Sequence, residues 1–466
     1  MPTLTFSELT DVTGGRWLLE PRNAADGCAR VWDDSRSIRP GDLFVAIAGE
    51  LADGHRYVAP AIAAGAAAVL LQNAPDAEVL EKAAAAGCPV LQVPDTLAAY
   101  QQLALWHRRR FPQARVLAIT GSCGKTSTKE MVAAMLEQRW PGGVLKTIGS
   151  TNNHFGVPRN LYRIDGTTRV AVIEMGTNHP GEIARLATIA PPDAGVVCNI
   201  GHAHLEAFHD LRGVATEKGT LLSGILPGGP AVYPLEAVGA DILETDAAGH
   251  PVTTFGLGEK ADVRYRYLGY AQGAFGLELA WKASGEKRVV RWSIGGAHMA
   301  ANAAAAAAAA TALGLTPDEI AAGLARCALP GQRLEVSEVN GVKWVNDAFN
   351  ANPDSTRAAL EWMAEVAADA PQVLLLGDML ELGEGAIQSH REILRYARKC
   401  CPGACIMTVG KLMKEALADL PEHADIGNLP DAATAAAWLA GRELSTGWIL
   451  LKSSHGIGLS ALAPKK

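Results

Sequence analysis

Residues 116–136 read VLAITGSCGKTSTKEMVAAML, and their pattern predicts how this part of the chain folds. An apolar strand pattern comes first, a short loop with two glycines follows, and a helical pattern begins near Ser127. Glycines let the backbone approach a phosphate closely, and the free amides of a helix N-terminus favour an anion. The stretch therefore predicts a nucleotide phosphate loop formed by Gly121, Ser122, Cys123, Gly124, Lys125, Thr126 and Ser127.

Two side chains of this loop carry the chemistry expected of it. Lys125 brings a cation to the β and γ phosphate oxygens of a nucleotide, and Thr126 brings a hydroxyl to Mg²⁺. The spacing is shorter than the standard GxxxxGK[ST], because the first glycine lies only three residues before Gly124. An ordinary turn is the alternative, but the order strand, loop, helix favours the phosphate loop.

Short apolar runs alternate with helical segments over the rest of the chain. VLAIT, VAVIEMG and AGVVCNI each end in a small or polar residue, and VLLLGDM, CIMTVG and WILLKSS repeat the pattern later. The alanine-rich stretch 300–314 has high helix propensity and ends at Gly314, which predicts a closely packed helix. The alternation is typical of an α/β fold with parallel sheets.

The length of 466 residues is too great for one core, since domains average about 150 residues. A first α/β unit contains DSRSIRPGDLFVAI, a helical run over 59–67 and the strand AAVLL, and it ends near the basic stretch WHRRRFPQA. A later unit starts near LPGQRLEV. We therefore predict three domains: a small α/β domain over 1–113, a central parallel-sheet domain with the phosphate loop over 114–329, and a Rossmann-like α/β domain over 330–466.

Composition and charge exclude several classes of function. Lysine and arginine total 42 against 49 acidic residues, and the net charge of −7 disfavours a general affinity for nucleic acid. No apolar run approaches the roughly 20 residues that cross a bilayer, and the start MPTLTFSELTDV lacks an export pattern. The eight cysteines are too sparse for a disulfide scaffold, and a metal knuckle at 400–405 is the lesser alternative. We expect a monomer in the reducing cytoplasm.

The shortened GxxGKT loop resembles that of the Mur ligases, the ATP-dependent amide-forming enzymes of peptidoglycan precursor synthesis. Further motifs follow in the family's order, and the resemblance covers essentially the whole chain. They are Glu174 in VIEMGTNHPGEI, His204 in NIGHAHLEAF, Lys218 in GVATEKG, Asn302 in GAHMAAN, Arg333 in LPGQRLEV and Asp347 in WVNDAFNANPDS. The resemblance implies a ligase that forms a C–N bond through an acyl phosphate and releases ADP and phosphate.

Two sequence motifs indicate which reaction of the family the resemblance implies. EMGTNHPGEI and LLLGDMLELGE resemble the family members that add D-alanyl-D-alanine to a UDP-N-acetylmuramoyl-tripeptide. Sibling ligases that add the third amino acid, diaminopimelate or lysine, share the chemistry and are the first alternative. A phosphate-loop NTPase of another kind, or a silent nucleotide-binding module, would not need the acidic and basic residues that follow the loop.

The resemblance also implies a site for two Mg²⁺ ions, with Thr126, Glu174, His204 and a carbamylated Lys218 as ligands. Lys125, His204 and Lys218 are the implied catalytic residues. From the residues alone, Glu174 also fits a helix cap, the HAHLEAFH stretch also fits a zinc site, and Lys218 also fits a solvated surface charge. A carbamate would turn the Lys218 cation into an anionic oxygen ligand, which Mg²⁺ prefers.

For the nucleotide, the resemblance implies contacts from Asn302, Arg333 and Asp347, the last two reaching ATP from the C-terminal domain. His298 precedes Asn302 by four residues and therefore shares its helix face. The residues that the resemblance implies for substrate binding are Ser35, Arg36, Asp53, His55, Asn152, Asn153, Asn350, Asn352 and Lys452. For those of the N-terminal domain, Ser35, Arg36, Asp53 and His55, helix capping and turn formation are the alternative roles.

Overall fold

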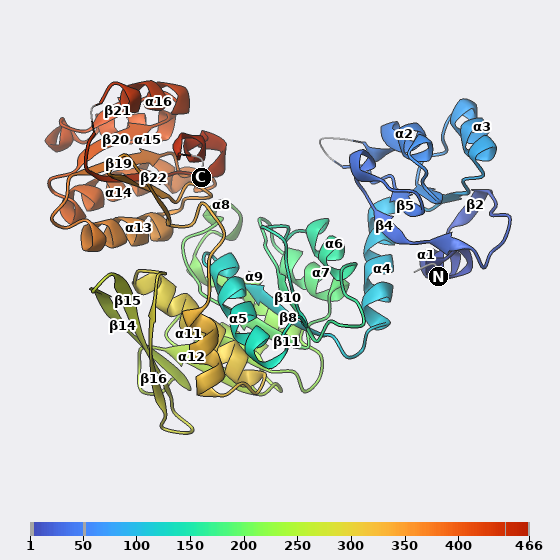
Figure 1. Ribbon diagram of the computed structural model, residues 1–466, viewed down its shortest axis with the longest axis horizontal. Helices are drawn as coiled ribbons and strands as arrows, with labels where there is room; N and C mark the ends of the chain where they lie inside the picture. Colours follow the sequence, from blue (N-terminus) through green and yellow to red (C-terminus); the bar gives the residue numbers. More distant parts are fainter. Residues whose placement is uncertain (1–3, 50–52, 443, 465–466) are drawn as a thin grey trace.

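The computed structural model describes residues 4–49, 53–442 and 444–464 of the chain. These residues form three α/β units that follow one another along the chain (Figure 1). The central unit lies between the other two, with the N-terminal unit on one side and the C-terminal unit on the other (Figure 1). The predicted α/β class with three domains is confirmed.

The N-terminal domain contains β1 (Leu4–Thr5), α1 (Phe6–Thr13), β2 (Arg16–Leu19), β3 (Gly27–Cys28), β4 (Arg30–Trp32), β5 (Asp42–Val45), α2 (Val58–Ala63), β6 (Ala68–Leu71), α3 (Ala77–Ala86), β7 (Val90–Gln92) and α4 (Thr96–Arg109). Its main sheet has the strand order β2-β7-β6-β5-β4. The helical run predicted over 59–67 ends earlier, because Gly65 turns the chain with a φ of 91°. Helix α4 leads from this domain to the central one (Figure 1).

The central domain contains β8 (Arg115–Thr120), α5 (Lys125–Arg139), β9 (Val144–Lys146), α6 (Gly156–Leu161), β10 (Val170–Glu174), α7 (Glu182–Ile189), β11 (Ala194–Val197), α8 (Leu205–Phe208), α9 (Leu211–Ser223), β12 (Ala231–Pro234), α10 (Ala240–Asp246), β13 (Val252–Gly256), β14 (Val263–Ala271), β15 (Ala274–Trp281), β16 (Lys287–Trp292), α11 (Ala297–Ala312) and α12 (Pro317–Ala325). These strands form one sheet in the order β16-β15-β14-β13-β12-β11-β8-β10-β9. Strand β8, which leads into the phosphate loop, pairs in parallel with β10 on one side and β11 on the other. The loops that follow these three strands therefore meet at one edge of the sheet.

The central sheet continues beyond the predicted parallel strands into an antiparallel extension. Strand β15 pairs antiparallel with both β14 and β16. The alternation of strands and helices did not predict this extension, although VRYRYLGYA and KRVVRW show the period of two that is typical of half-exposed strands. The extension reaches the C-terminal domain, where the hydroxyl of Tyr267 donates a hydrogen bond to Glu365 at 2.6 Å.

The C-terminal domain contains β17 (Glu335–Val339), β18 (Val342–Asn346), α13 (Pro353–Val366), β19 (Gln372–Gly377), α14 (Ala386–Cys400), β20 (Cys405–Val409), α15 (Lys411–Ala418), β21 (Gly427–Leu429), α16 (Ala432–Ala440) and β22 (Gly447–Lys452). Its sheet has the order β17-β18-β22-β19-β20-β21, with β17 antiparallel to β18 and the other pairs parallel. The strands predicted from VLLLGDM, CIMTVG and WILLKSS are β19, β20 and β22. The predicted boundaries at 113/114 and 329/330 fall in the connections α4–β8 and α12–β17, and their positions stay predictions.

The alanine-rich helix α11 lies in the core of the central domain and packs against α5. Residues 303–310 are all alanine, and each of them is 0% exposed. Small side chains let two helices approach closely, so α11 packs directly on α5. The prediction of a closely packed helix is confirmed.

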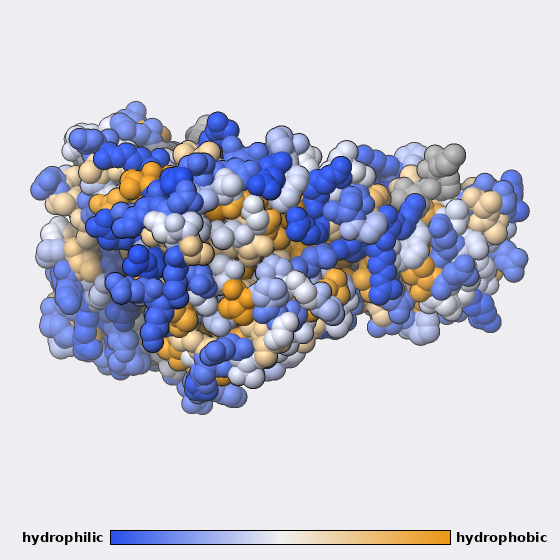
Figure 2. Space-filling view, turned by 90° about the horizontal axis from the view of Figure 1, so that it is seen from below, coloured by the Kyte–Doolittle hydropathy of each residue, from blue (hydrophilic) through white to orange (hydrophobic). Residues whose placement is uncertain are grey.

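Across the described ranges, no helix combines the length and apolarity that spanning a bilayer requires. All eight cysteines carry free thiols. The face seen in Figure 2 is largely hydrophilic, with apolar residues in scattered patches.

Candidate functional site: a phosphate loop facing the C-terminal domain

The phosphate loop connects β8 to α5, as the sequence predicts. Helix α5 begins at Lys125, two residues before the predicted start, because Gly124 takes the cap position with a φ of 75°. The ammonium of Lys125 folds back over the loop and donates hydrogen bonds to the carbonyls of Gly121 at 2.8 Å and Ser122 at 3.5 Å. Its charge is therefore already held over the concave side of the loop, where a phosphate would lie.

Two glycines permit contacts that no larger residue would allow. A Cβ at Gly121 would lie 2.2 Å from the sulfur of Cys198, and a Cβ at Gly124 would lie 2.2 Å from Oδ1 of Asn302. Both distances are far below van der Waals contact. The loop consequently packs against Cys198, directly after β11, on one side and against Asn302, in the second turn of α11, on the other.

Asn199 holds the loop in shape, and sequence reasoning missed this residue. Its Oδ1 accepts a hydrogen bond from the amide of Cys123 at 3.0 Å, and its Nδ2 donates to the Cys123 carbonyl at 2.9 Å. The signal in the sequence is a polar residue directly after the strand AGVVC, next to the phosphate loop in a parallel sheet. Ser122 is fixed similarly, because its hydroxyl and the backbone of Gly201 exchange hydrogen bonds at 2.9 Å.

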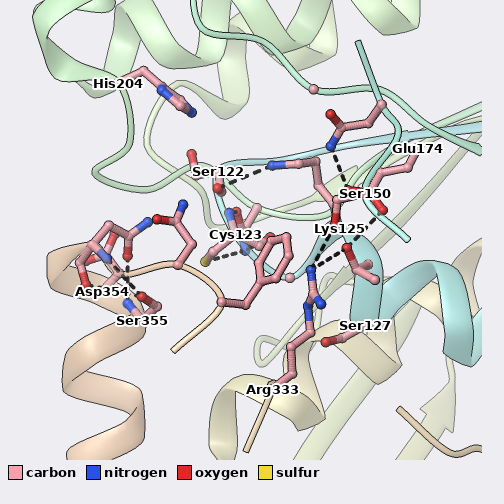
Figure 3. Close-up of a pocket in the computed structure, with 18 of the residues that line it drawn as sticks. Ser122, Cys123, Lys125, Ser127, Ser150, Glu174, His204, Arg333, Asp354 and Ser355 are labelled. Carbon is pink, nitrogen blue, oxygen red and sulfur yellow. Dashed lines mark hydrogen bonds between the residues drawn. The ribbon is translucent and has the colours of Figure 1, made fainter. Parts of the chain in front are cut away.

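Glu174 ends β10 beside the phosphate loop, with only 1% of its surface exposed. The hydroxyl of Thr126 donates to its Oε2 at 2.9 Å, and Nδ2 of Asn152 donates to its Oε1 at 2.9 Å (Figure 3). Arg333 reaches the same point from the C-terminal side, donating to Oγ of Thr126 at 2.9 Å and to Ser150 at 3.3 Å (Figure 3). A carboxylate, a hydroxyl and a guanidinium from distant parts of the chain thus meet at the start of α5.

The connection that carries Arg333 is sharply turned. The residues on both sides, Gln332 and Leu334, have left-handed φ angles of 65° and 49°. Such conformations are uncommon for residues other than glycine and persist where surrounding contacts hold them. The guanidinium also lies 4.1 Å from the ring centre of Phe349, and burial lowers the pKa of Arg333. The conformation aims the arginine at the phosphate loop.

The oxygen donors of Thr126 and Glu174 suit a magnesium ion, which prefers oxygen ligands and retains several waters. Among the residues with described positions, no three His, Cys, Asp or Glu side chains gather as a ready metal site. Of the histidines in the zinc alternative, His202 is paired with Asp354, with its Nδ1 3.1 Å from Oδ1. His204 lines the cavity (Figure 3), and its Nδ1 lies 3.2 Å from Oε2 of Glu381.

Lys218 lies on α9 and is only 1% exposed, so the alternative of a solvated surface charge is wrong. Burial lowers its pKa to about 7, with the charge of Lys125 as the next cause. A buried lysine with this pKa has a substantial neutral fraction near pH 7, and only the neutral amine reacts with CO₂ to form a carbamate. Its role as a metal ligand stays a prediction.

The C-terminal side of the site holds a buried ion pair. Lys452 is 3% exposed, its ammonium lies 2.7 Å from Oδ2 of Asp347, and it donates to the carbonyl of Asn350 at 2.8 Å. Asn352 caps the start of α13 by accepting a hydrogen bond from the amide of Ser355 at 2.8 Å. These residues follow β18 and end β22, so neighbouring strands place them at one edge of the sheet.

A cavity of about 620 Å³ joins the two domains at this point. His298 lines it as well, and burial lowers the pKa of this histidine to about 4. Most of the predicted nucleotide, metal and peptide contacts share this cavity. They are Ser122, Cys123, Gly124, Lys125, Thr126, Ser127, Asn152, Asn153, Glu174, His204, Asn302, Arg333, Asp347, Asn350, Asn352 and Lys452.

The four predicted substrate residues of the N-terminal domain do not line this cavity. Asp53 caps the short helix Gly54–Tyr57 and pairs with His55, whose Nε2 accepts a hydrogen bond from the amide of Gln72 at 3.0 Å. Hydrogen bonds from the His55 backbone and ring lower the pKa of Asp53. Ser35 and Arg36 belong to the short helix Ser35–Ser37, and Arg36 is paired with Asp34, the cap of that helix. These contacts fit the capping alternative, and ligand contacts at these residues stay a prediction.

Comparison with known proteins agrees with this arrangement. The profile described as "Mur ligase family, catalytic domain" matches residues 31–104, "Mur ligase middle domain" matches 119–310, and "Mur ligase, glutamate ligase domain" matches 332–455. The chain is 36% identical over 414 residues to the UDP-N-acetylmuramoyl-tripeptide–D-alanyl-D-alanine ligase of Escherichia coli, a match that spans 88% of this chain and 87% of that protein. The ligase of the same name from Bacillus subtilis is 35% identical over 364 residues, or 77% of this chain and 75% of that protein.

Solved structures of proteins named MurF are similar to this chain as well. MurF from Acinetobacter baumannii superimposes with a TM-score of 0.88 at 31% identity, covering 98% of this chain and 97% of that one. The MurF ligase from Thermotoga maritima, solved in complex with ADP, has a TM-score of 0.79 at 25% identity, covering 93% of this chain and 96% of that one. The similarity extends over all three domains.

Proposed function

This chain belongs to the Mur ligase family, and from that premise we propose that it uses ATP to join D-alanyl-D-alanine to a UDP-N-acetylmuramoyl-tripeptide. The observation that carries the proposal is the cavity in which the phosphate loop faces Arg333, Asp347 and Lys452 of the C-terminal domain. Relatives named for this reaction match most of the chain, which supports the same substrates.

The first step activates a carboxylate. Transfer of the γ-phosphoryl group of ATP to the terminal carboxylate of the tripeptide gives an acyl phosphate and ADP, and cations must offset the charge that builds on the transferred group. Lys125 and Arg333 are suited to this role, because one lies over the loop and the other meets Thr126 at 2.9 Å. Mg²⁺ would neutralise phosphate charge when bound, and Thr126 and Glu174 are the residues we propose to hold it.

The second step brings the amine of the dipeptide to the acyl carbon, with loss of phosphate and of a proton from the amine. We propose that Asn350, Asn352 and Lys452 hold the dipeptide. The ammonium of Lys452 is the cation suited to the carboxylate of D-alanyl-D-alanine, and its pairing with Asp347 at 2.7 Å keeps it oriented. We propose that Asp347 also binds the ribose of ATP and that Asn302, beside Gly124, contacts the nucleotide.

The remaining proposed contacts belong to the nucleotide sugar and its peptide. Ser35, Arg36, Asp53 and His55 would bind the uridine diphosphate, and Asn152 and Asn153 would lie against the muramoyl-peptide. The cavity supports the peptide contacts, because both asparagines line it.

His204 and a carbamylated Lys218 remain our proposed ligands for a second Mg²⁺. We propose the cytoplasm as the compartment, which the free thiols suit, and a monomer as the working form.

Phosphate release by the purified protein tests the reaction. With ATP, Mg²⁺ and UDP-N-acetylmuramoyl-tripeptide present, release should depend on D-alanyl-D-alanine, and mass spectrometry should find the pentapeptide product. Equal stimulation by a single amino acid acting on a shorter precursor would instead identify a sibling ligase. Phosphate release that is independent of every peptide substrate would favour an NTPase of another kind.

A further inference from the structure

Lys129 is a buried lysine to which neither the phosphate-loop motif nor the proposed reaction gives a role. It lies on α5 one turn after Thr126, and it is 0% exposed. Lysine is almost never fully buried unless it is paired, because removing its charge from water is costly. The partners of its ammonium should therefore explain why it is there.

The ammonium of Lys129 contacts two kinds of group. It donates hydrogen bonds to the carbonyls of Thr147 at 2.9 Å and Gly149 at 3.1 Å. It also lies 3.2 Å from Oε1 of Glu130 and 3.9 Å from Oε2 of Glu174. One cation thus joins α5, the carboxylate at the end of β10, and the backbone that follows β9.

The backbone held by Lys129 leads directly into the site. The segment 147–153 follows β9, and it contains Ser150, which accepts a hydrogen bond from Arg333, and Asn152, which donates one to Glu174. Thr147, the first residue of the segment, also bonds to Glu174, because its hydroxyl accepts a hydrogen bond from the backbone amide of Glu174 at 2.9 Å. The position of this segment and the orientation of the Glu174 carboxylate are therefore set together.

We propose that Lys129 is a positioning residue that locks the segment 147–153 and the Glu174 carboxylate into one arrangement. The inference rests on the proposed ligase function, and it adds a residue outside the phosphate-loop contacts. With Lys129 in place, Asn152 and Asn153, which we propose to contact the peptide substrate, keep a fixed distance from the Glu174 carboxylate, which accepts a hydrogen bond from the hydroxyl of Thr126. Transfer between two substrates needs such a separation, since misplacement of about 1 Å costs up to about 10²-fold in rate.

The test compares the full-length variants Lys129→Met and Lys146→Met. Lys146 is the matched control, because its ammonium also pairs with Glu130 but its side chain is 48% exposed, whereas the ammonium of Lys129 is the one that bonds to the carbonyls of Thr147 and Gly149 and lies near Glu174. In Lys129→Met, we expect kcat to fall about 10- to 100-fold, as for residues that orient a site from behind. Affinity for ADP without Mg²⁺, measured by calorimetry, should change less than about threefold, because the ammonium of Lys129 contacts Glu130, Glu174 and the carbonyls of Thr147 and Gly149, which lie outside the loop.

Hydrogen–deuterium exchange supplies a readout that does not need turnover. Peptides that cover 147–153 should exchange faster in Lys129→Met, while peptides that cover β8 and the phosphate loop should not change. Wild-type exchange and wild-type kcat in a folded Lys129→Met protein would overturn the proposal. If the methionine variant does not fold, Lys129→Gln takes its place with the same expected and contrary results. If the wild-type protein itself forms no pentapeptide, the proposed function fails. The exchange experiment still tests whether Lys129 keeps the segment 147–153 in place, because it does not need turnover.

Discussion

Nδ1 of His204 lies 3.2 Å from Oε2 of Glu381, so a side chain of the central domain is paired with one of the C-terminal domain. Both residues have left-handed φ angles, 54° and 66°. The hydrogen bond with His204 lowers the pKa of Glu381. A carboxylate on one ring nitrogen leaves Nε2 as the nitrogen available to a metal ion or a phosphate. The pair thus joins the central and C-terminal domains and also orients the ring of His204.

Glu381→Gln should loosen this contact between domains. We expect a larger radius of gyration in small-angle scattering than for the wild-type protein when no nucleotide is present. A non-hydrolysable ATP analogue with the tripeptide substrate should compact both proteins, because Arg333 and Asp347 then gain a shared ligand. Equal radii for the two proteins in every condition would mean that the pair has no influence on domain position.

Lys125→Ala should keep the fold and lose turnover. The loop takes its shape from its glycines and from Asn199, whereas Lys125, whose ammonium lies over the loop, is the cation that we propose for the transferred phosphoryl group. We expect kcat to fall about 10²- to 10⁴-fold, as for loss of an electrostatic contact in the transition state, with little change in the thermal unfolding temperature. Near-normal ligation by the folded variant would contradict the role of Lys125.

Lys218→Ala should be nearly inactive and regain part of its activity when a short-chain carboxylic acid is added. The acid would replace the carbamate oxygens in the space that the side chain leaves. Wild-type activity should also fall after exhaustive removal of dissolved CO₂ and recover with bicarbonate. A fully active Lys218→Ala protein without added acid would remove the carbamate from the mechanism.

His298 should make the protein less stable in mild acid. Its pKa is lowered from an ordinary 6.5 to about 4 by burial, so the unfolded chain takes up a proton before the folded protein does. The folded state therefore loses stability as the pH falls from about 6.5 toward 4, by at most about 1.4 kcal/mol per pH unit, and gains nothing above that range. Thermal unfolding of His298→Gln and wild type at pH 7.5, 6 and 5 tests this. The wild-type protein should lose more, and parallel losses would contradict the assignment.

The phosphate loop and the parallel strands were predictable because local patterns encode them. A strand, a glycine loop and a helix occupy consecutive residues, and Glu174 follows its strand in the same way. The antiparallel strands β14 to β16 were missed even though their alternating residues carry the signal. A search for period-two stretches within the apparent strand–helix alternation would have found them.

Other parts of the site depend on tertiary structure. No local pattern distinguishes buried Lys129 and Lys218 from surface lysines on a helix, because burial is decided by what packs over them. Glu381 acts through His204, which belongs to another domain, so its role appears only once the two domains are assembled. Such contacts have no signature in a single sequence.

The alanine helix α11 also sets how closely the phosphate loop lies against the core of the central domain. The eight consecutive alanines at 303–310 put only methyl groups on every side of this buried helix, and Asn302, the residue before them, lies against Gly124 of the loop. A methylene added on the side of α11 that packs on α5 would push the two helices apart and move Asn302 away from Gly124. The least varied stretch of the sequence is thus a spacer that sets the distance between the phosphate loop and the core.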